Sequence, residues 1–249
     1  MKSAKWLCVY SLGQLGRPYW YGCFGQTADA SLLKEKRNQY PDYYDQSKYN
    51  VKFTDQFGQK VHDCSGLIKG AQFCDSIDGA PKYDSKYDFS ANGMITKACS
   101  KTGDIKSIPN MPGLIVWKNN HVGVYLGDNK VCEARGHDWG VVITDLKDRG
   151  WQKWGQLNFF SYEEPKPTPD TACQPVLPVL RKGIKGEAVK SLQVLLNHLG
   201  VKDQNGNKLE VDGSFGSKTE WAVKDFQARH GLTIDGIVGS KTWQMIIGG

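Results

Sequence analysis

A proline-rich stretch divides the chain into two parts. The segment SYEEPKPTPDTACQP (161–175) is charged and shows no hydrophobic periodicity. Proline fixes φ and lacks a backbone N–H, so such a segment forms neither a regular helix nor a central strand, and we expect a semi-rigid extended linker. The sequence therefore predicts a larger domain over residues 1–162, a linker over 163–175 and a small domain over 176–249.

The composition is that of a globular protein able to bury a core. Hydrophobic residues make up 39% of the 249 positions and charged residues 23%, and no apolar run is long enough to cross a bilayer. The N-terminal stretch KWLCVYSLGQLG (5–16) is broken by Ser11 and Gly13. We therefore expect an amphipathic helix there, and a protein made in the cytoplasm without a signal peptide.

The cysteines and the charge disfavour several classes of protein. The seven cysteines form no CxxC pair and no zinc-finger spacing, so we expect six of them to be free, packed thiols in a reducing compartment. The net charge of +6 is spread along the chain without a basic block. Nucleic acid is therefore a poor candidate partner, whereas an anionic polymer is compatible with the surface charge.

The first domain shows helical patterns followed by strand patterns. In DCSGLIKGAQFC, the apolar positions recur at helical spacing. Short strand-like runs follow over 114–117, 121–127, 130–136 and 140–146, and the turn GDNK joins the middle two as a hairpin. Helices followed by an antiparallel meander indicate the α+β class.

The second domain has the pattern of a three-helix bundle. GEAVKSLQVLLNHLG carries an apolar stripe, and SKTEWAVKDFQARHG is expected to bury Trp221, Ala222 and Phe226. The motif DGSFGSKT (212–219) recurs as DGIVGSKT (235–242). In each copy Asp-Gly favours a turn, and the serine stands where an N-cap would precede the next helix.

Cys64 is the candidate nucleophile. It follows Asp63 and precedes Ser-Gly at the predicted start of a helix, where unpaired backbone N–H groups stabilise a thiolate. Asp63 can cap the helix, and Gly66 lets a substrate approach its first turn. A buried, inert thiol is the alternative for this position.

His121 is the best-placed base among the five histidines, because it opens a predicted strand at a sheet edge. Glu133 lies on the next strand of the hairpin, where it can face the same side as His121 and orient the imidazole. A solvated turn histidine and an exposed strand carboxylate are the alternatives for these two residues.

The order of these motifs resembles the NlpC/P60 family of cysteine peptidases. The matching pieces are GRPYWYG (16–22), HDCSGLI (62–68), MPGLIVW (111–117) and HVGVYLGDNKVCEARG (121–136). The resemblance implies a papain-like α+β fold that cleaves peptidoglycan stem peptides, with Cys64 as nucleophile, His121 as base and Glu133 as third polar residue. That third position is often histidine in the family, so Glu133 is a departure.

The same resemblance implies an oxyanion site and no metal or organic cofactor. The family's active-site tyrosine falls on Tyr19, whose hydroxyl would join the Cys64 backbone N–H. Between Tyr19 and Cys64 lie 44 residues, longer than in compact members, and the insert over 26–61 either shapes specificity or forms a surface loop.

Residues 180–243 independently resemble a three-helix peptidoglycan-binding domain of the PG_binding_1 type. A wall-binding module beside a wall-cleaving module favours a peptidoglycan hydrolase, and the expected absence of a signal peptide favours a phage or prophage endolysin that reaches the wall after release. The resemblance favours the γ-D-glutamyl–diamino acid bond. An N-acetylmuramoyl-L-alanine amidase and a non-catalytic wall-binding protein are the alternatives.

Overall fold

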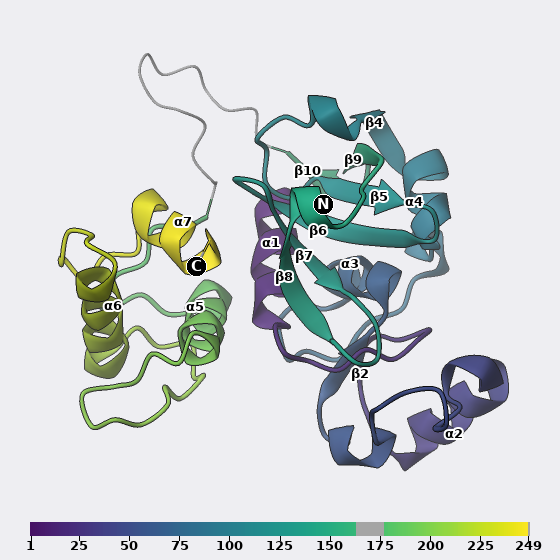
Figure 1. The fold of residues 1–249 in the computed structure, drawn as a ribbon, viewed down its shortest axis with the longest axis horizontal. Helices are drawn as coiled ribbons and strands as arrows, with labels where there is room; N and C mark the ends of the chain where they lie inside the picture. The colour runs from purple at the N-terminus through teal and green to yellow at the C-terminus, as the bar shows by residue number, and fades with distance from the viewer. Residues whose placement is uncertain (163–176, 249) are drawn as a thin grey trace.

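The computed structural model describes residues 1–162 and 177–248, which form a mixed α/β domain and a helical C-terminal unit (Figure 1). The linker predicted over 163–175, including Cys173, lies outside the described residues. Cys8, Cys23, Cys74 and Cys132 are buried free thiols, as the sequence predicts for them, whereas Cys64 and Cys99 are free and partly exposed.

A six-stranded antiparallel sheet organises the first domain. Its spatial order is β4-β9-β5-β6-β7-β8. The strands are β4 (Cys99–Asp104), β5 (Ile115–Lys118), β6 (His121–Gly127), β7 (Lys130–Ala134), β8 (Val141–Asp145) and β9 (Lys153–Leu157). The four runs predicted as strands form β5 to β8, which confirms the α+β class. Strands β4 and β9 were not predicted, because β4 is mostly polar and exposed and β9 has a central glycine.

Two short strand pairs close the domain. In the first, β1 (Lys2–Ser3) pairs in parallel with β10 (Phe160–Ser161), so the start of the chain is held against the end of this domain. In the second, β2 (Phe24–Thr27) pairs with β3 (Lys60–His62), which leads directly to Cys64.

Three helices pack on one face of the sheet: α1 (Ala4–Gly13), α3 (Cys64–Phe73) and α4 (Ala91–Lys97). Side chains of α1 and α3 share a core with Val122 and Val124 of β6, whereas Val116 and Tyr125 point to the opposite face and pack with Trp151 and Trp154. The strand alternation thus separates a helix-covered face from a second apolar face.

The insert over 26–61 folds around its own aromatic core. It contains α2 (Ala30–Gln39) and two short 3₁₀ turns, Pro41–Tyr43 and Phe53–Gln56. Trp20 is fully buried between the rings of Tyr44 and Phe53 and donates from Nε1 to Gln56 Oε1 at 2.6 Å. The insert is therefore a packed subdomain, at the end of the molecule where Figure 1 shows α2.

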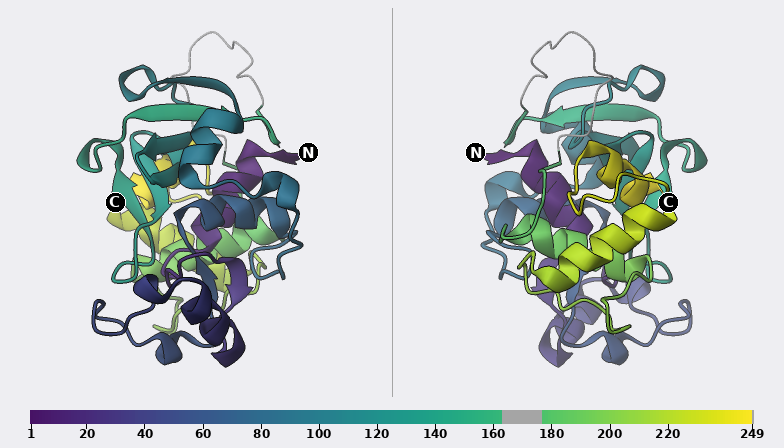
Figure 2. Two further views of the ribbon diagram at one scale, coloured as in Figure 1. Left: turned by 90° about the vertical axis from the view of Figure 1, so that its right-hand side faces the viewer. Right: turned by 90° about the vertical axis from the view of Figure 1, so that its left-hand side faces the viewer.

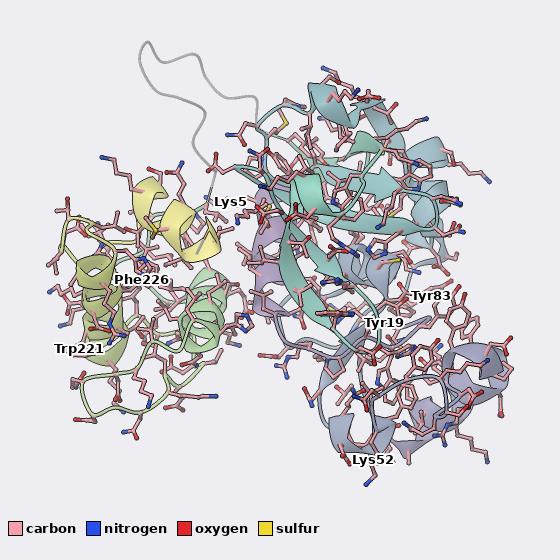
Figure 3. All side chains as sticks on the ribbon, in the orientation of Figure 1. Lys5, Tyr19, Lys52, Tyr83, Trp221 and Phe226 are labelled. Atoms are coloured by element: carbon pink, nitrogen blue, oxygen red, sulfur yellow. The ribbon has the colours of Figure 1, made fainter. Side chains whose placement is uncertain are left out.

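The C-terminal unit consists of α5 (Glu187–His198), α6 (Ser217–Arg229) and α7 (Ser240–Gly248). The stripe on α5 is buried as predicted, apart from Leu199 just beyond the helix. Trp221, expected in the core, is instead 41% exposed and lies on the outer side of α6 (Figure 3). The serines of the repeated motif are the first residues of α6 and α7, not their N-caps.

The two copies of the repeated motif make the same hydrogen bonds. Gln193 donates from Nε2 to Asp212 and accepts from the Gly213 N–H, each within 2.9 Å. In the second copy, Gln227 makes the corresponding bonds to Asp235 and Gly236 at the same distances. A buried glutamine thus holds each Asp-Gly turn and satisfies polar groups that would otherwise be costly to bury.

Helix α5 packs against α1 and joins the two parts of the molecule (Figure 2). The Ser191 hydroxyl donates to the Val9 carbonyl oxygen at 2.8 Å, and the Glu187 carboxylate accepts from the Ile77 N–H at 2.7 Å. Because the sheet and α3 cover its other sides, α1 is buried almost all round. The expectation of an amphipathic first helix is therefore wrong, because α5 covers the face that was expected to be polar and exposed to solvent.

Within the described residues, none of the helices combines the length and the apolar character needed to span a membrane.

The packing of α5 on α1 predicts the effect of a charge at this junction. Ser191 is 1% exposed, so in Ser191→Asp an unpaired carboxylate would lie between two helices. We expect the two parts to separate, with a larger radius of gyration in small-angle scattering and increased binding of an apolar dye to the uncovered face of α1. Ser217→Asp, at the exposed start of α6, is the control and should change neither measurement. An unchanged scattering curve for Ser191→Asp would contradict the packing.

Candidate functional site

Asp63 positions Cys64 at the first residue of α3. Asp63 Oδ1 accepts from the Gly66 N–H at 2.5 Å and from the Ser65 hydroxyl at 3.0 Å, as the predicted N-cap requires. Its Oδ2 accepts from the Gly22 N–H at 2.8 Å. A Cβ at position 66 would lie 1.9 Å from the Cys23 carbonyl oxygen, so only glycine allows this close approach.

The Cys64 thiol lies against the main chain on either side of His121. Its Sγ is 4.0 Å from the Asn120 carbonyl oxygen. Burial raises the pKa of Cys64 to about 12, with a smaller contribution from Asp63, although the N–H groups of Val122, Ser65 and Cys64 favour the thiolate. The predicted effect of the helix N-terminus is thus present but outweighed by desolvation, and the thiol needs a base to accept its proton.

The imidazole of His121 is hydrogen-bonded to Glu133, with Nε2 and Oε2 separated by 2.6 Å. Val124 pairs with Cys132 across the hairpin, which places Glu133 diagonally opposite His121 on the same face of the sheet. Among the described residues Sγ of Cys64 forms no hydrogen bond with the imidazole. Since Nε2 is occupied by Glu133, Nδ1 is the nitrogen available to the thiol proton, and such bonds commonly tighten only when substrate binds.

Glu133 is fully buried, and all of its acceptor positions are used. Oε1 accepts from the Thr144 hydroxyl at 2.6 Å and from Arg149 Nε at 2.7 Å, and Oε2 accepts from His121 and from Arg149 Nη2 at 3.2 Å. Burial acts to raise the pKa of Glu133, but the hydrogen bonds from His121, Arg149 and Thr144 outweigh it and lower the pKa to about 2. The carboxylate is therefore ionised and held in one orientation.

Trp151 supports the other side of the imidazole. The two rings are stacked, with centroids 5.4 Å apart and an interplanar angle of 12°. A Cβ at Gly123 would lie 2.6 Å from the Val131 side chain and 3.2 Å from Trp151, so the glycine leaves room for both side chains. Sequence reasoning missed Thr144, Arg149 and Trp151, because they belong to no motif and approach Glu133 or His121 only in the folded chain.

Tyr19 lies close to Cys64 because residues 18–20 run beside β3. It forms a bridge with His62, and the Trp20 N–H donates to the His62 carbonyl oxygen at 3.1 Å. Burial, followed by Asp63 and Cys64, raises the pKa of Tyr19 well above its ordinary value, so its hydroxyl stays protonated and can donate. Figure 3 shows Tyr19 between the sheet and the insert.

In the described part of the chain, no cluster of three or more His, Cys, Asp or Glu side chains is placed to hold a metal ion.

Two family models match the chain. Residues 46–157 match the NlpC/P60 family, and residues 185–246 match the peptidoglycan binding domain family. The first match contains Cys64, His121 and Glu133, and the second contains α5 and α6. The chain combines an NlpC/P60 domain with a peptidoglycan-binding domain.

Relatives among curated proteins share a small part of the chain. A spore cortex-lytic enzyme of Bacillus cereus is 41% identical over 69 residues, which are 28% of this chain and 25% of that protein. The zinc D-Ala-D-Ala carboxypeptidase of Streptomyces albus G is 40% identical over 27% of this chain and 25% of its own. The N-acetylmuramoyl-L-alanine amidase CwlL of Bacillus licheniformis is 45% identical over a segment that makes up 24% of this chain and 17% of that protein. The chain thus spans about a quarter of the length of the first of these relatives.

The solved structure of the SleB N-terminal domain is 39% identical in sequence to the matched segment, which makes up 28% of this chain and 90% of that domain's chain, with a TM-score of 0.26.

In the NlpC/P60 domain, His137 fastens the insert to the loop between β7 and β8. It is 7% exposed, and its ring lies 4.2 Å from Tyr49, 5.3 Å from Phe53 and 5.0 Å from Tyr19, measured between centroids. The neighbouring Asp138 accepts from the Asn50 N–H at 3.1 Å. Burial lowers the pKa of His137 to about 4, although nearby backbone groups and Asp138 act in the opposite direction. The insert thus packs against the loop between β7 and β8, whose His137 also contacts Tyr19.

The buried neutral His137 predicts an acid-dependent loss of stability. Its pKa is near 6.5 in the unfolded chain and about 4 in the folded one, so its stabilising contribution is complete above pH 6.5 and is lost as the pH falls toward 4. His137→Phe should reduce that loss by about 3 kcal/mol. Urea unfolding of both proteins at neutral and acidic pH measures the difference. Some loss should remain because burial also lowers the pKa of His62, to about 3. Equal losses in variant and parent would contradict this role.

Proposed function

We propose that the chain is a peptidoglycan hydrolase whose NlpC/P60 domain cleaves stem-peptide amide bonds with Cys64 as nucleophile. The observation that carries the proposal is the arrangement at one corner of the sheet: a thiol at a helix N-terminus lies against the backbone of Asn120 and Val122, on either side of a histidine whose ring is held by a buried carboxylate. A nucleophile, a base and a group that orients the base are the components of a cysteine acyl-transfer site.

In the proposed reaction, Nδ1 of His121 accepts the thiol proton as Sγ attacks the amide carbon. The resulting imidazolium is stabilised by the Glu133 carboxylate and then donates its proton to the leaving amine. Because burial keeps the pKa of Cys64 high, this proton transfer is the step that makes the thiol reactive. Water, activated by the same imidazole, releases the acyl group and restores the thiol.

The proposed oxyanion site uses the Tyr19 hydroxyl and the Cys64 backbone N–H. Tyr19 is suited to this role because it stays protonated beside Cys64, and the N–H lies at the positive end of α3. The family resemblance supports the γ-D-glutamyl–diamino acid bond as the bond cleaved. The peptidoglycan-binding domain would bring this site to the wall and raise its local concentration there.

Mass spectrometry of digested purified wall tests the bond. The proposal expects stem peptides cut after the D-glutamyl residue, with the link between muramic acid and L-alanine intact. A free lactyl carboxylate on muramic acid, with a free amine on L-alanine, would show an amidase instead, and an undigested wall would show a non-catalytic binding protein.

Cys64→Ala should abolish digestion while folding and wall sedimentation are retained, because the substitution removes the nucleophile with little change in volume. Cys74→Ala is the matched control: its thiol lies just beyond the end of the same helix, near the Tyr10 hydroxyl, and its loss should leave digestion intact. The opposite pattern would overturn the assignment of the nucleophile.

His121→Ala should lower the digestion rate nearly as much as Cys64→Ala, since groups that act as one catalytic unit are not additive. Glu133→Gln should be milder, because an amide oxygen still accepts from the ring N–H. Full activity in Glu133→Ala would argue against the orienting role.

A further inference from the structure

Glu133 brings a full negative charge next to the base. An ionised carboxylate at 2.6 Å from the imidazole places a negative charge near Cys64, and that charge disfavours a second negative charge on the sulfur. It therefore raises the pH at which a reactive thiolate forms. A cation beside Glu133 would offset the carboxylate charge and still leave the hydrogen bond between His121 and Glu133 in place.

Arg149 is placed to offset it. Its guanidinium contacts both carboxylate oxygens, Oε1 through Nε at 2.7 Å and Oε2 through Nη2 at 3.2 Å. Such two-point contact fixes the plane of the carboxylate as well as its charge. The Lys118 ammonium donates to the Arg149 carbonyl oxygen at 2.8 Å, which anchors the loop that carries the guanidinium.

Arg149 is the cation in direct contact with the Glu133 carboxylate. The charged or titratable groups that act on Glu133 or on the thiol include Arg149, Lys118 at the end of β5, Cys132 of β7, Tyr19 beside β3 and Asp63 before α3, while Arg135 beyond β7 acts on Lys118. Of the three cations, Arg149 is the one hydrogen-bonded to Glu133, while Thr144 supplies a neutral donor to the same oxygen.

We propose that Arg149 is a positioning residue that holds Glu133 against His121 and neutralises its charge, and so sets the pH at which Cys64 becomes reactive. The inference rests on the proposed nucleophile and base but not on which bond they cleave. Loss of the guanidinium leaves an uncompensated carboxylate, so the thiol releases its proton at higher pH.

The rate of Cys64 alkylation by iodoacetamide, followed by peptide mapping as a function of pH, tests this role in the full chain. In Arg149→Met the acidic limb of the profile should move to higher pH by about one unit. Arg149→Lys, which keeps the charge but not the two-point contact, should shift it less. Thr144→Val removes a neutral donor and should leave the limb in place. Identical limbs in the parent and in Arg149→Met would overturn the proposal.

A second pair of variants keeps the test decisive if Arg149→Met does not fold. Glu133→Gln leaves an unopposed guanidinium and should move the acidic limb to lower pH, whereas the double variant of Glu133→Gln with Arg149→Met should return it toward the parent. Coincident limbs in these two proteins would also overturn the proposal.

Alkylation requires no wall substrate, so its result is separate from that of the digest. A chain that cleaves a different bond still shows the shift. If Cys64 of the parent reacts no faster than the partly exposed Cys99, both the proposed nucleophile and the role of Arg149 are wrong.

Discussion

The Asp63 carboxylate is the point on which the arrangement of the site depends. One of its oxygens caps α3 and so places Cys64 at the helix start, and the other holds Gly22 in the segment that carries Tyr19. The two ends of the insert reach this point through β2 and β3, which pair with each other. A single buried acceptor thus joins the candidate nucleophile, the tyrosine beside it and the base of the insert, because each of these segments has a backbone N–H or hydroxyl that it satisfies.

Burial and charge act against each other at both ends of the candidate site. At Cys64 the N–H groups of the helix start favour the thiolate, yet desolvation is larger and keeps the proton on sulfur. At Glu133 the order is reversed, because hydrogen bonds from three side chains outweigh desolvation and keep the carboxylate ionised. The number of donors explains the difference: a carboxylate offers about four acceptor positions to fixed donors, whereas a thiolate is a weak acceptor.

Sequence patterns were sufficient where a local rule determines the structure. The cap and apolar spacing of 63–74 predicted α3, and the alternating runs around GDNK predicted the hairpin that brings Glu133 next to His121. They failed where the environment comes from distant residues. Helix α1 was expected to be amphipathic, but α5 covers the face that would have been exposed. Trp221 is exposed because Ala222, Val223 and Phe226 fill the core side of α6. Arg149 reaches Glu133 from a loop without a recognisable motif.

The contact between α1 and α5 changes what can be exchanged between proteins of this architecture. Here Ser191 and Glu187 of the peptidoglycan-binding domain bond to the backbone of Val9 and Ile77, and α1, the first helix of the chain, depends on α5 for cover. A chimera that replaces residues 177–248 with an unrelated binding domain would expose this helix, so domain exchange requires either retention of α5 or a redesigned polar surface on α1.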